Sequence, residues 1–544
     1  MPNVWLKHYA EDIPHEVDIP EISLPDMLKD TVRKYGEKEA LSFYGQTMTY
    51  KELQYRTSAF ASALQKKGIR KGDRVAIMLP NCPQYVISYY GILTAGAVVT
   101  QVNPMLVGRE LTHILNDSGA RVLVIYKDLL PVLEKVQDSL SLENVVTVDL
   151  KGKEGSEEEN YIPFSHFLAS GTDKVEPPKI NPGEDTAVLQ YTGGTTGRSK
   201  GAMLTHRNLI ANLTQTYEFF KHDLKKGEER YLTVIPLFHV FGMTACMNLS
   251  VYSGSLSVML PRFELEEVLE TIKREQPTSF PGVPTMYVAL NSHPEAESYG
   301  IDSVKVCNSG SAPMPLELMR SFENKTSSTI LEGYGLSETS PTTHVNPSFG
   351  ERKPGSVGIP LPSTECKIVD LGEGIKELKA GETGEVIIKG PQVMKGYWNM
   401  PEETAIALRN GWLYTGDIGK MDEDGYLYIV DRKKDLIIAS GYNIYPRDIE
   451  EVLYEHEAVQ EAVAVGIPDK YKGEAVKAVV VFKDGKSATE EELISFCRHN
   501  MAAYKVPSYI ESRQQLPKTN VGKILRRAIK EEARKQAAEK QSPL

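Results

Sequence analysis

The chain has 544 residues, which is too long for a single hydrophobic core, so we expect at least two domains. Its hydrophobic content of 41% and charged content of 25% are typical of a globular protein. The formal net charge of −11 argues against a nucleic-acid-binding protein, because phosphate backbones require a basic protein face.

The cysteines and the N-terminal sequence indicate the cellular location of the protein. Five cysteines lie far apart, without a Cys-x-x-Cys pair, which indicates neither a disulfide framework nor a zinc site. The N-terminus carries acids and prolines where a signal peptide would be apolar. Residues 81–108 lack charge but include Pro, Asn and Gln, which favours a buried helix and a core strand over a membrane span. We therefore expect a cytoplasmic protein without a transmembrane segment.

Short β-branched runs alternate with helical patterns along the first 200 residues. Strands are predicted at residues 74–79, 120–126 and 186–191, and a helix at residues 50–68. This alternation predicts an α/β protein with largely parallel sheets. The charged segment 151–160 is expected to be a surface loop, and the Pro-rich segment 172–185 is expected to connect two subdomains.

Residues 191–201, YTGGTTGRSKG, combine glycines, hydroxyl side chains and two cations. Glycines let backbone N–H groups approach an anion, and the cations balance its charge, so the composition suits a polyphosphate. The Walker spacing is absent, because Ser199 precedes Lys200 and a second strand is predicted to follow before a helix capped by Thr205. We interpret the segment as a loop between two strands that covers phosphates. The alternative is an ordinary glycine hairpin with a basic tip.

Two apolar stretches in the middle of the chain allow two interpretations. Residues 232–261 contain no charged side chain, and residues 280–290 read FPGVPTMYVAL. Both could line a tunnel for an alkyl chain, or both could be ordinary core packing.

Four further segments carry residues suited to nucleotide chemistry. In ILEGYGLSET, a strand is predicted to lead into a turn that bears Tyr334 and Glu338. In NGWLYTGDIG, Asp417 is predicted to lie in a glycine-flanked turn, from which a carboxylate can accept hydrogen bonds from a ribose. A basic run that leads into a glycine loop (residues 431–446) and a loop that carries Lys523 ahead of a basic helix (residues 516–527) complete the set.

The pattern changes after about residue 430. Residues 462–469 and 477–485 predict two strands, and a charged helix is predicted to end the chain. We predict a large N-terminal domain at residues 1–431, built of α/β subdomains with mostly parallel sheets. A small α+β domain is predicted at residues 432–544.

The ordered set TGGTTGRSKG, YGLSET, YTGD, DRKKD, GYNIYP and PKTNVGK resembles the AMP-forming adenylate-forming superfamily, which includes the acyl-CoA synthetases. Within it, the run from residue 411 to residue 527 is particularly similar to bacterial long-chain fatty acid CoA ligases. The resemblance covers nearly the whole chain. It implies ATP-dependent activation of a fatty acid to acyl-AMP with release of pyrophosphate, followed by transfer to coenzyme A.

The resemblance also implies roles for individual residues. ATP or AMP would be bound by a set of backbone and side-chain groups that comprises Thr192, Gly193, Gly194, Thr195, Thr196, Gly197, Lys200, Gly310, Ser311, Ala312, Gly333, Tyr334, Gly335, Asp417 and Arg432. Tyr334 would stack on adenine, Asp417 would bind the ribose, and Thr339 would donate to the α-phosphate. Glu338 would hold Mg²⁺, which takes few protein carboxylates beside phosphate oxygens.

The same family pattern implies a mobile C-terminal domain that exchanges two groups at one site. Lys523 would act during adenylation, and the loop of Gly441, Tyr442 and Asn443 would act with coenzyme A. Lys434 matches the pivot position. The alternative makes Lys523 a phosphate-steering charge and the loop a plain turn.

His239 bears on the substrate. Amino-acid-activating relatives have an Asp in the segment that here reads PLFHVFGM, so its absence would leave a substrate ammonium unpaired. An uncharged acyl chain is therefore favoured, with His239 beside the reacting carboxylate. The alternative for His239 is a hydrogen-bonded core histidine.

Other functions remain open on sequence alone. A phosphotransferase would release ADP, an oxygenating relative would consume O₂ after adenylation, and a carrier protein could replace coenzyme A. The expected partners are a fatty acid, ATP and coenzyme A, with no nucleic acid. The sequence leaves an oligomer and peripheral membrane contact open.

Overall fold

The computed structural model describes residues 3–151, 160–192, 199–312, 314–326, 328–439, 442–469, 473–519 and 524–539. The chain divides into two compact units. The larger unit comprises residues 2–366 and 388–414, and the smaller unit mainly comprises residues 367–387 and 415–544. The domain boundary predicted between residues 431 and 432 remains a prediction.

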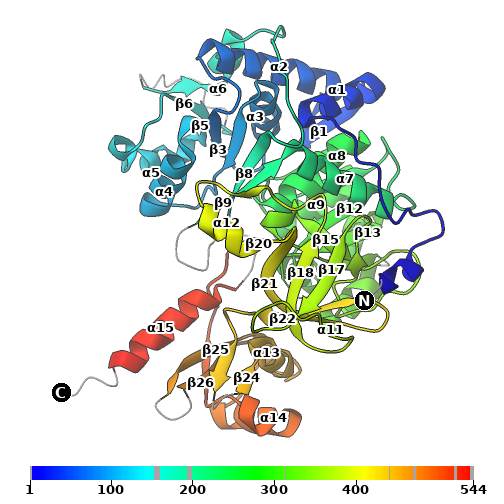
Figure 1. Ribbon diagram of the computed structural model, residues 1–544, viewed down its shortest axis with the longest axis vertical. Coiled ribbons are helices and arrows are strands. Elements are labelled where there is room, and N and C mark those ends of the chain that lie inside the picture. Colours follow the sequence, from blue (N-terminus) through cyan, green and yellow to red (C-terminus); the bar gives the residue numbers. More distant parts are fainter. Residues whose placement is uncertain are drawn as a thin grey trace. The chain divides into compact units, whose positions relative to one another are not determined.

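The first large sheet has eight strands, of which β8, β4, β3, β5, β6 and β7 are parallel neighbours (Figure 1). Strands β9 and β19 extend it in antiparallel fashion. In spatial order the strands are β19 (Gly396–Tyr397), β9 (Lys200–Thr205), β8 (Thr186–Thr192), β4 (Val98–Gln101), β3 (Arg74–Met78), β5 (Ala120–Tyr126), β6 (Asn144–Val148) and β7 (Ile162–Pro163).

The second large sheet has nine strands. Strands β14, β13, β12, β10, β11 and β1 are parallel neighbours, and antiparallel strands close both edges. In spatial order the strands are β16 (Ile359–Pro360), β15 (Thr342–Val345), β14 (Thr329–Gly335), β13 (Val306–Ser309), β12 (Ser279–Gly282), β10 (Arg230–Thr233), β11 (Leu256–Met259), β1 (Glu39–Phe43) and β2 (Gln46–Thr49).

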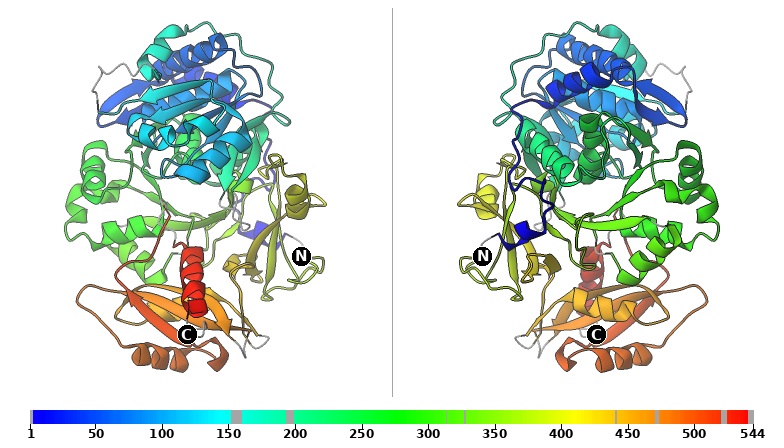
Figure 2. Two further views of the ribbon diagram at one scale, coloured as in Figure 1. Left: turned by 90° about the vertical axis from the view of Figure 1, so that its left-hand side faces the viewer. Right: turned by 90° about the vertical axis from the view of Figure 1, so that its right-hand side faces the viewer.

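Helices flank both sheets of the larger unit (Figures 1 and 2). They are α1 (Leu24–Tyr35), α2 (Tyr50–Lys66), α3 (Pro83–Thr94), α4 (Gly108–Ser118), α5 (Leu130–Glu134), α6 (Phe164–Ser170), α7 (His206–Phe219), α8 (Leu249–Ser253), α9 (Leu265–Glu275), α10 (Pro284–Ser292), α11 (Leu316–Thr326) and α12 (Pro401–Ala407). Helix α7 begins as predicted, because the Thr205 side chain accepts a hydrogen bond from the Asn208 N–H. The uncharged stretch at 81–108 forms α3 and β4, as predicted.

Two segment predictions differ from the structure or fall outside it. Residues 172–185 join α6 to β8, and both β7, just before α6, and β8 belong to the eight-stranded sheet. The prediction that residues 172–185 connect two subdomains is therefore wrong. A Pro-rich composition predicts an irregular segment, but it does not predict a domain boundary. Most of the charged segment, residues 152–159, lies outside the described residues.

Two smaller sheets lie further along the chain. One consists of β17 (Glu365–Val369), β18 (Gly384–Lys389), β21 (Trp412–Met421) and β20 (Leu408–Arg409), with β22 (Leu427–Arg432) beside β21. The other consists of β24 (Tyr442–Ile444), β23 (Ile437–Ala439), β26 (Gly473–Phe482) and β25 (Val459–Asp469), with β27 (Tyr509–Arg513) beside β26. Helices α13 (Pro446–Tyr454), α14 (Glu490–Asn500) and α15 (Arg526–Glu539) accompany the second sheet. The α/β prediction, with a smaller C-terminal part, is confirmed.

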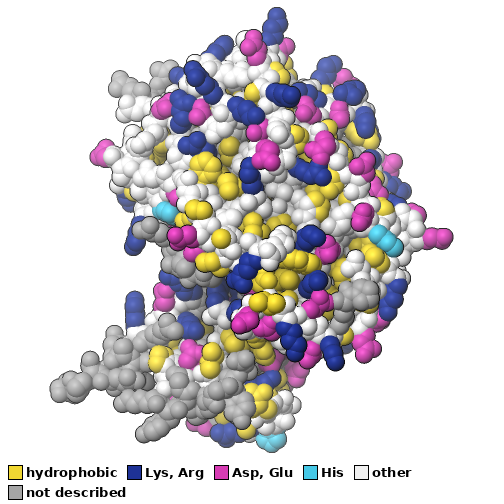
Figure 3. Space-filling view, in the orientation of Figure 1, with side chains coloured by type: hydrophobic (Ala, Val, Ile, Leu, Met, Phe, Trp, Pro, Cys, Tyr) yellow, Lys and Arg dark blue, Asp and Glu magenta, His cyan; other side chains and the backbone are white. Residues whose placement is uncertain are grey.

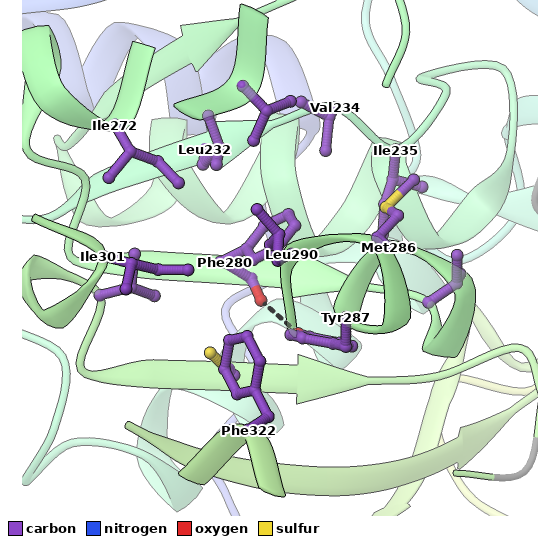
Figure 4. Close-up of a cluster of buried hydrophobic side chains, with 14 of the residues drawn as sticks. Leu232, Val234, Ile235, Ile272, Phe280, Met286, Tyr287, Leu290, Ile301 and Phe322 are labelled. Carbon is purple, nitrogen blue, oxygen red and sulfur yellow. Dashed lines mark hydrogen bonds between the residues drawn. The ribbon is translucent and has the colours of Figure 1, made fainter. Parts of the chain in front are cut away.

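The apolar stretches 232–261 and 280–290 contribute side chains to one hydrophobic core (Figure 4). Phe280 is 1% exposed and Tyr287 is fully buried, and the Tyr287 hydroxyl donates to the Phe280 carbonyl at 2.8 Å. Tyr287 also packs edge-on against Phe322. Of the two interpretations left open by the sequence, core packing describes these side chains.

Charges of both signs cover the face of the larger unit that Figure 3 shows, with small groups of hydrophobic side chains between them. None of the described helices is both long and apolar enough to cross a membrane.

We predict that Tyr287→Phe lowers stability by about 1 kcal/mol and Tyr287→Ala by about 3–5 kcal/mol. The first change removes one buried donor, and the second also leaves a cavity. Differential scanning calorimetry should rank the melting temperatures in that order. If Tyr287→Ala kept the wild-type melting temperature, Tyr287 would not be a core residue and the tunnel interpretation would be correct instead.

Candidate active site

The glycine-rich segment joins two antiparallel strands, as predicted. Thr192 at the end of β8 lies opposite Lys200 at the start of β9. Thr192 and Lys200, which belong to the predicted ATP- or AMP-binding set, are therefore paired where the two strands meet the loop. Gly193, Gly194, Thr195, Thr196 and Gly197 lie outside the described residues.

Lys200 lies in a small polar network that the sequence did not predict. Its ammonium forms an ion pair with Glu403 on α12, and it lies 5.1 Å from the centroid of the Tyr397 ring. The Tyr397 hydroxyl donates to Glu338 Oε1 at 2.8 Å. Burial and the Glu338 carboxylate raise the pKa of Tyr397, so its hydroxyl stays protonated and remains a donor. The network thus connects two predicted site residues, Lys200 and Glu338, through Tyr397.

The surroundings of Glu338 are compatible with a role as a magnesium ligand. One carboxylate oxygen is hydrogen-bonded to Tyr397, and the described residues contain no cluster of three or more His, Cys, Asp or Glu side chains that could hold a metal. A lone, half-buried carboxylate fits Mg²⁺, which takes most of its ligands from water and substrate phosphates.

Two segments of the predicted ATP- or AMP-binding set lie at the ends of two neighbouring parallel strands. Gly310, Ser311 and Ala312 come directly after β13, and Gly333, Tyr334 and Gly335 end β14. Because parallel strands end at the same edge of a sheet, the structure brings these two segments together. A Cβ at Gly335 would lie 2.1 Å from the Pro341 carbonyl oxygen, so only glycine fits there.

Tyr334 is half-buried, and its ring lies 6.0 Å from the ring of His344. Burial lowers the pKa of His344 to about 3, so this histidine is neutral. Tyr334 therefore packs beside an uncharged ring, an environment compatible with a stacked purine.

Thr339 is fully buried in the 3₁₀ turn η7 (Ser337–Thr339), directly after β14. Its hydroxyl oxygen accepts a hydrogen bond from the Leu336 N–H at 2.9 Å, and the hydroxyl contacts the Leu336 and Pro341 carbonyls. The single hydroxyl proton is thus directed at the backbone, and donation to a phosphate would require this bond to be exchanged.

His239 lies in the turn that follows β10. The side chain is half-buried, and its Nδ1 accepts from the Phe241 N–H at 3.2 Å. When Nδ1 accepts, Nε2 of the neutral ring carries the proton. Phe241, two residues further on, packs on the segment of Gly310 to Ala312, because a Cβ at Gly310 would lie 3.2 Å from the Phe241 ring.

In the smaller unit, Asp417 lies within strand β21, so the prediction that it lies in a turn is wrong. Gly416 adopts a φ of +71°, and the register with β22 shifts between Ile418 and Gly419, so the glycines on either side of Asp417 mark an irregular strand. Asp417 lies opposite Arg432 on β22, and Arg432 Nε is 3.2 Å from Asp417 Oδ1. The structure therefore brings together two residues of the predicted ATP- or AMP-binding set.

The remaining predicted residues lie in the same unit. Lys434 is exposed in the turn between β22 and β23. Tyr442 and Asn443 begin β24, which pairs with β23 in a hairpin, whereas Gly441 and Lys523 lie outside the described residues.

Two acids flank Lys434 and share one cation. Arg526 Nη1 lies 3.3 Å from Asp431 Oδ1 and 3.5 Å from Asp435 Oδ2, while Nη2 donates to both oxygens of Glu450 at 2.6 and 2.7 Å. Burial raises the pKa values of Asp431 and Glu450, and Arg526 opposes that effect. The cluster ties the residues around Lys434 to α13 and α15.

Comparison with protein families matches residues 28–398 to the AMP-binding enzyme model and residues 448–523 to the AMP-binding enzyme C-terminal domain model. The chain belongs to the AMP-binding enzyme family. The resemblance read from the motifs is thereby confirmed.

Individual relatives agree with this assignment. The chain is 48% identical to the long-chain-fatty-acid–CoA ligase of Bacillus subtilis (strain 168), over 97% of this chain and 98% of the relative. Its fold matches ATP-bound MatB from Rhodopseudomonas palustris with a TM-score of 0.86 and 30% identity, over 94% of this chain and 98% of that one. It also matches the anthranilate CoA ligase AuaEII in complex with anthranoyl-AMP, with a TM-score of 0.87 and 29% identity, over 96% of this chain and 99% of that one.

We predict that Arg526→Met destabilises the smaller unit by about 3–5 kcal/mol near pH 8, because three carboxylates lose their shared cation. Acids whose folded-state pKa is raised stabilise the fold at low pH and lose that contribution as the pH rises through the raised value. The loss of melting temperature should therefore be smaller near pH 5.5 than near pH 8.

The neighbouring Arg527→Met is the matched control. Arg527 is exposed and forms an ion pair with Glu531 one turn along α15, so its removal should hardly change the melting temperature. Equal losses for both variants, or a larger loss for Arg526→Met at the lower pH, would contradict the account of the cluster.

Proposed function

We propose that this chain is an ATP-dependent long-chain fatty acid CoA ligase. It converts a fatty acid and ATP to acyl-AMP and pyrophosphate, and then transfers the acyl group to coenzyme A with release of AMP. The observation that carries this proposal is the 48% identity to a ligase of that name over 97% of the chain.

The chemistry explains why no covalent enzyme nucleophile is needed. The substrate carboxylate attacks the α-phosphorus of ATP in line, and pyrophosphate leaves. Catalysis then depends on positioning the reactants and neutralising charge. The loop between Thr192 and Lys200 would surround the leaving phosphates, and the Lys200 ammonium would exchange Glu403 for phosphate oxygens. Bound Mg²⁺ would neutralise phosphate charge, with Glu338 as its protein ligand.

The carboxylate and the nucleoside would be held by the loops at the strand ends. The His239 Nε2–H would donate to the carboxylate, since its Nδ1 accepts from the backbone. Gly310 to Ala312 and Gly333 to Gly335 would border the adenine, on which Tyr334 stacks, and Thr339 would donate to the α-phosphate. Asp417 would accept from the ribose hydroxyls, with Arg432 beside it.

The second half-reaction would use a different set of groups. The thiol of coenzyme A must reach the carbonyl carbon of acyl-AMP by the approach that the Lys523 ammonium occupies during adenylation. Rotation about Lys434 would remove Lys523 and introduce the segment of Gly441, Tyr442 and Asn443, of which Tyr442 and Asn443 belong to β24. Residues at domain boundaries commonly absorb such rotations.

The substrate is an uncharged acyl chain, because His239 occupies the position where amino-acid-activating relatives carry an Asp. The proposed location is the cytoplasm, and it is supported by the cysteines, all five of which are free and buried.

We predict that saturated or monounsaturated fatty acids of about 12 to 18 carbons are activated with higher kcat/KM than acetate, amino acids or hydroxycinnamates, because each buried CH₂ contributes about 0.8 kcal/mol. A panel assay should detect AMP and pyrophosphate in equal amounts. ADP as the product would indicate a phosphotransferase, and O₂ consumption would indicate an oxygenating enzyme. Preference for a short or aromatic acid would remove only the long-chain assignment.

We predict opposite defects for the two exchanging groups. Lys523→Ala should abolish carboxylate-dependent exchange of labelled pyrophosphate into ATP but still form thioester from supplied acyl-AMP and coenzyme A. Gly441→Leu should keep the exchange and block thioester formation, because its side chain would obstruct the thiol. Equal loss of both half-reactions in both variants, with circular dichroism unchanged, would show that one static arrangement serves both steps.

A further inference from the structure

Three buried amide side chains stand at the carboxyl ends of three neighbouring strands of the eight-stranded sheet. Asn81 follows β3, Gln101 ends β4, and Gln190 lies near the end of β8. Gln101 and Gln190 are direct partners in the β4–β8 ladder, so their side chains leave the sheet on the same face. The exposed fractions are 1% for Asn81, 2% for Gln101 and 4% for Gln190.

All three amides reach the segment that carries His239. Asn81 Nδ2 donates to the Ile235 carbonyl at 3.0 Å, and its Oδ1 accepts from the Leu237 N–H at 2.8 Å. Gln190 Nε2 donates at 3.1 Å to the Phe238 carbonyl, which belongs to the peptide directly before His239.

Gln101 contacts the same segment four residues after His239, at Met243. Its Nε2 lies 2.9 Å from Met243 Sδ, at the start of the π-helix η4 (Gly242–Asn248). The Met243 N–H in turn donates to the His239 carbonyl at 2.9 Å. A π-helix is rare and is found often at functional sites.

The π-helix also contacts the turn that carries Thr339. The Thr244 hydroxyl donates to the Ser340 carbonyl at 2.8 Å. The segment held by the amides therefore connects His239 with Thr339, the two residues that the proposed function places at the carboxylate and at the α-phosphate.

The two glutamines are poorly suited to a purely structural role. Among the described residues, neither Gln101 Oε1 nor Gln190 Oε1 has a hydrogen-bond partner, although both are buried. An unsatisfied buried amide oxygen destabilises a fold, and an apolar side chain of similar size would avoid that cost. The buried amide groups instead fix the position of the backbone next to His239 through hydrogen bonds.

We propose that Gln190 and Gln101 are positioning residues for adenylation, which fix the Pro236–Met243 segment so that the His239 ring meets the substrate carboxylate. The inference rests on the proposed function. Gln190 contributes more than Gln101, because a carbonyl oxygen accepts a hydrogen bond better than a thioether sulfur.

The test compares Gln190→Leu and Gln101→Leu in the full-length protein by pyrophosphate exchange, melting temperature and hydrogen–deuterium exchange. For Gln190→Leu we expect kcat of adenylation to fall about 10- to 100-fold, because a displacement of about 1 Å can cost that much. The KM for ATP should stay within about twofold. The melting temperature should change little, because the loss of the donor to the Phe238 carbonyl is offset by removal of the unsatisfied Oε1. Amide protons of residues 236–243 should exchange faster. Gln101→Leu should show the same pattern to a smaller degree.

Tyr50→Phe is the matched control, because Tyr50 is fully buried and its hydroxyl donates to the Ser250 and Ser255 carbonyls. It should lower the melting temperature without changing adenylation. Wild-type kcat in Gln190→Leu, or a kcat loss that only accompanies a lower melting temperature, would overturn the positioning role while leaving the proposed function intact. Absence of pyrophosphate exchange in the unmodified protein would overturn the proposed function and this inference together.

Discussion

The candidate site of the larger unit depends on one geometric constraint, which is that parallel strands end at a common edge of their sheet. Strands β3, β4 and β8 deliver three amides at one edge, while β10, β13 and β14 deliver the His239 turn and two glycine segments at another. Residues more than a hundred positions apart thereby become neighbours. Loops at such an edge can vary without disturbing the core, which suits an enzyme that must position several reactants.

Buried polar contacts then fix those loops in place. Tyr397 connects Glu338 with Lys200, and Asn81 satisfies three backbone groups around the turn before His239. Each contact fixes an orientation that apolar packing alone would leave loose, because hydrogen bonds are directional. In the smaller unit, Arg526 fixes the segment around Lys434 in a similar way, because it forms ion pairs with Asp431 and Asp435. The proposed pivot at Lys434 would therefore move together with the helices that carry Glu450 and Arg526.

Local chemistry made part of this predictable from the sequence. The apolar alternation gave the α/β class, Thr205 signalled the start of α7, and the composition of residues 191–201 placed a loop between two strands. Asp417 was misplaced, because glycines on both sides of a residue suit a turn and a strand irregularity equally well. Tyr397 and Glu403 carried no local signal, since their roles arise from the pairing of β19 with β9 and the position of α12. The amides likewise depend on contacts between distant segments.

The proposed reaction depends on attack of the substrate carboxylate on the α-phosphorus of ATP. A fatty acid with both carboxylate oxygens replaced by ¹⁸O tests this directly in the complete reaction with ATP and coenzyme A. Because the thiol later attacks the carbonyl carbon, one carboxylate oxygen stays on phosphorus, and mass spectrometry should find a single ¹⁸O in the AMP and none in the pyrophosphate. Unlabelled AMP, or label recovered in inorganic phosphate, would contradict this mechanism.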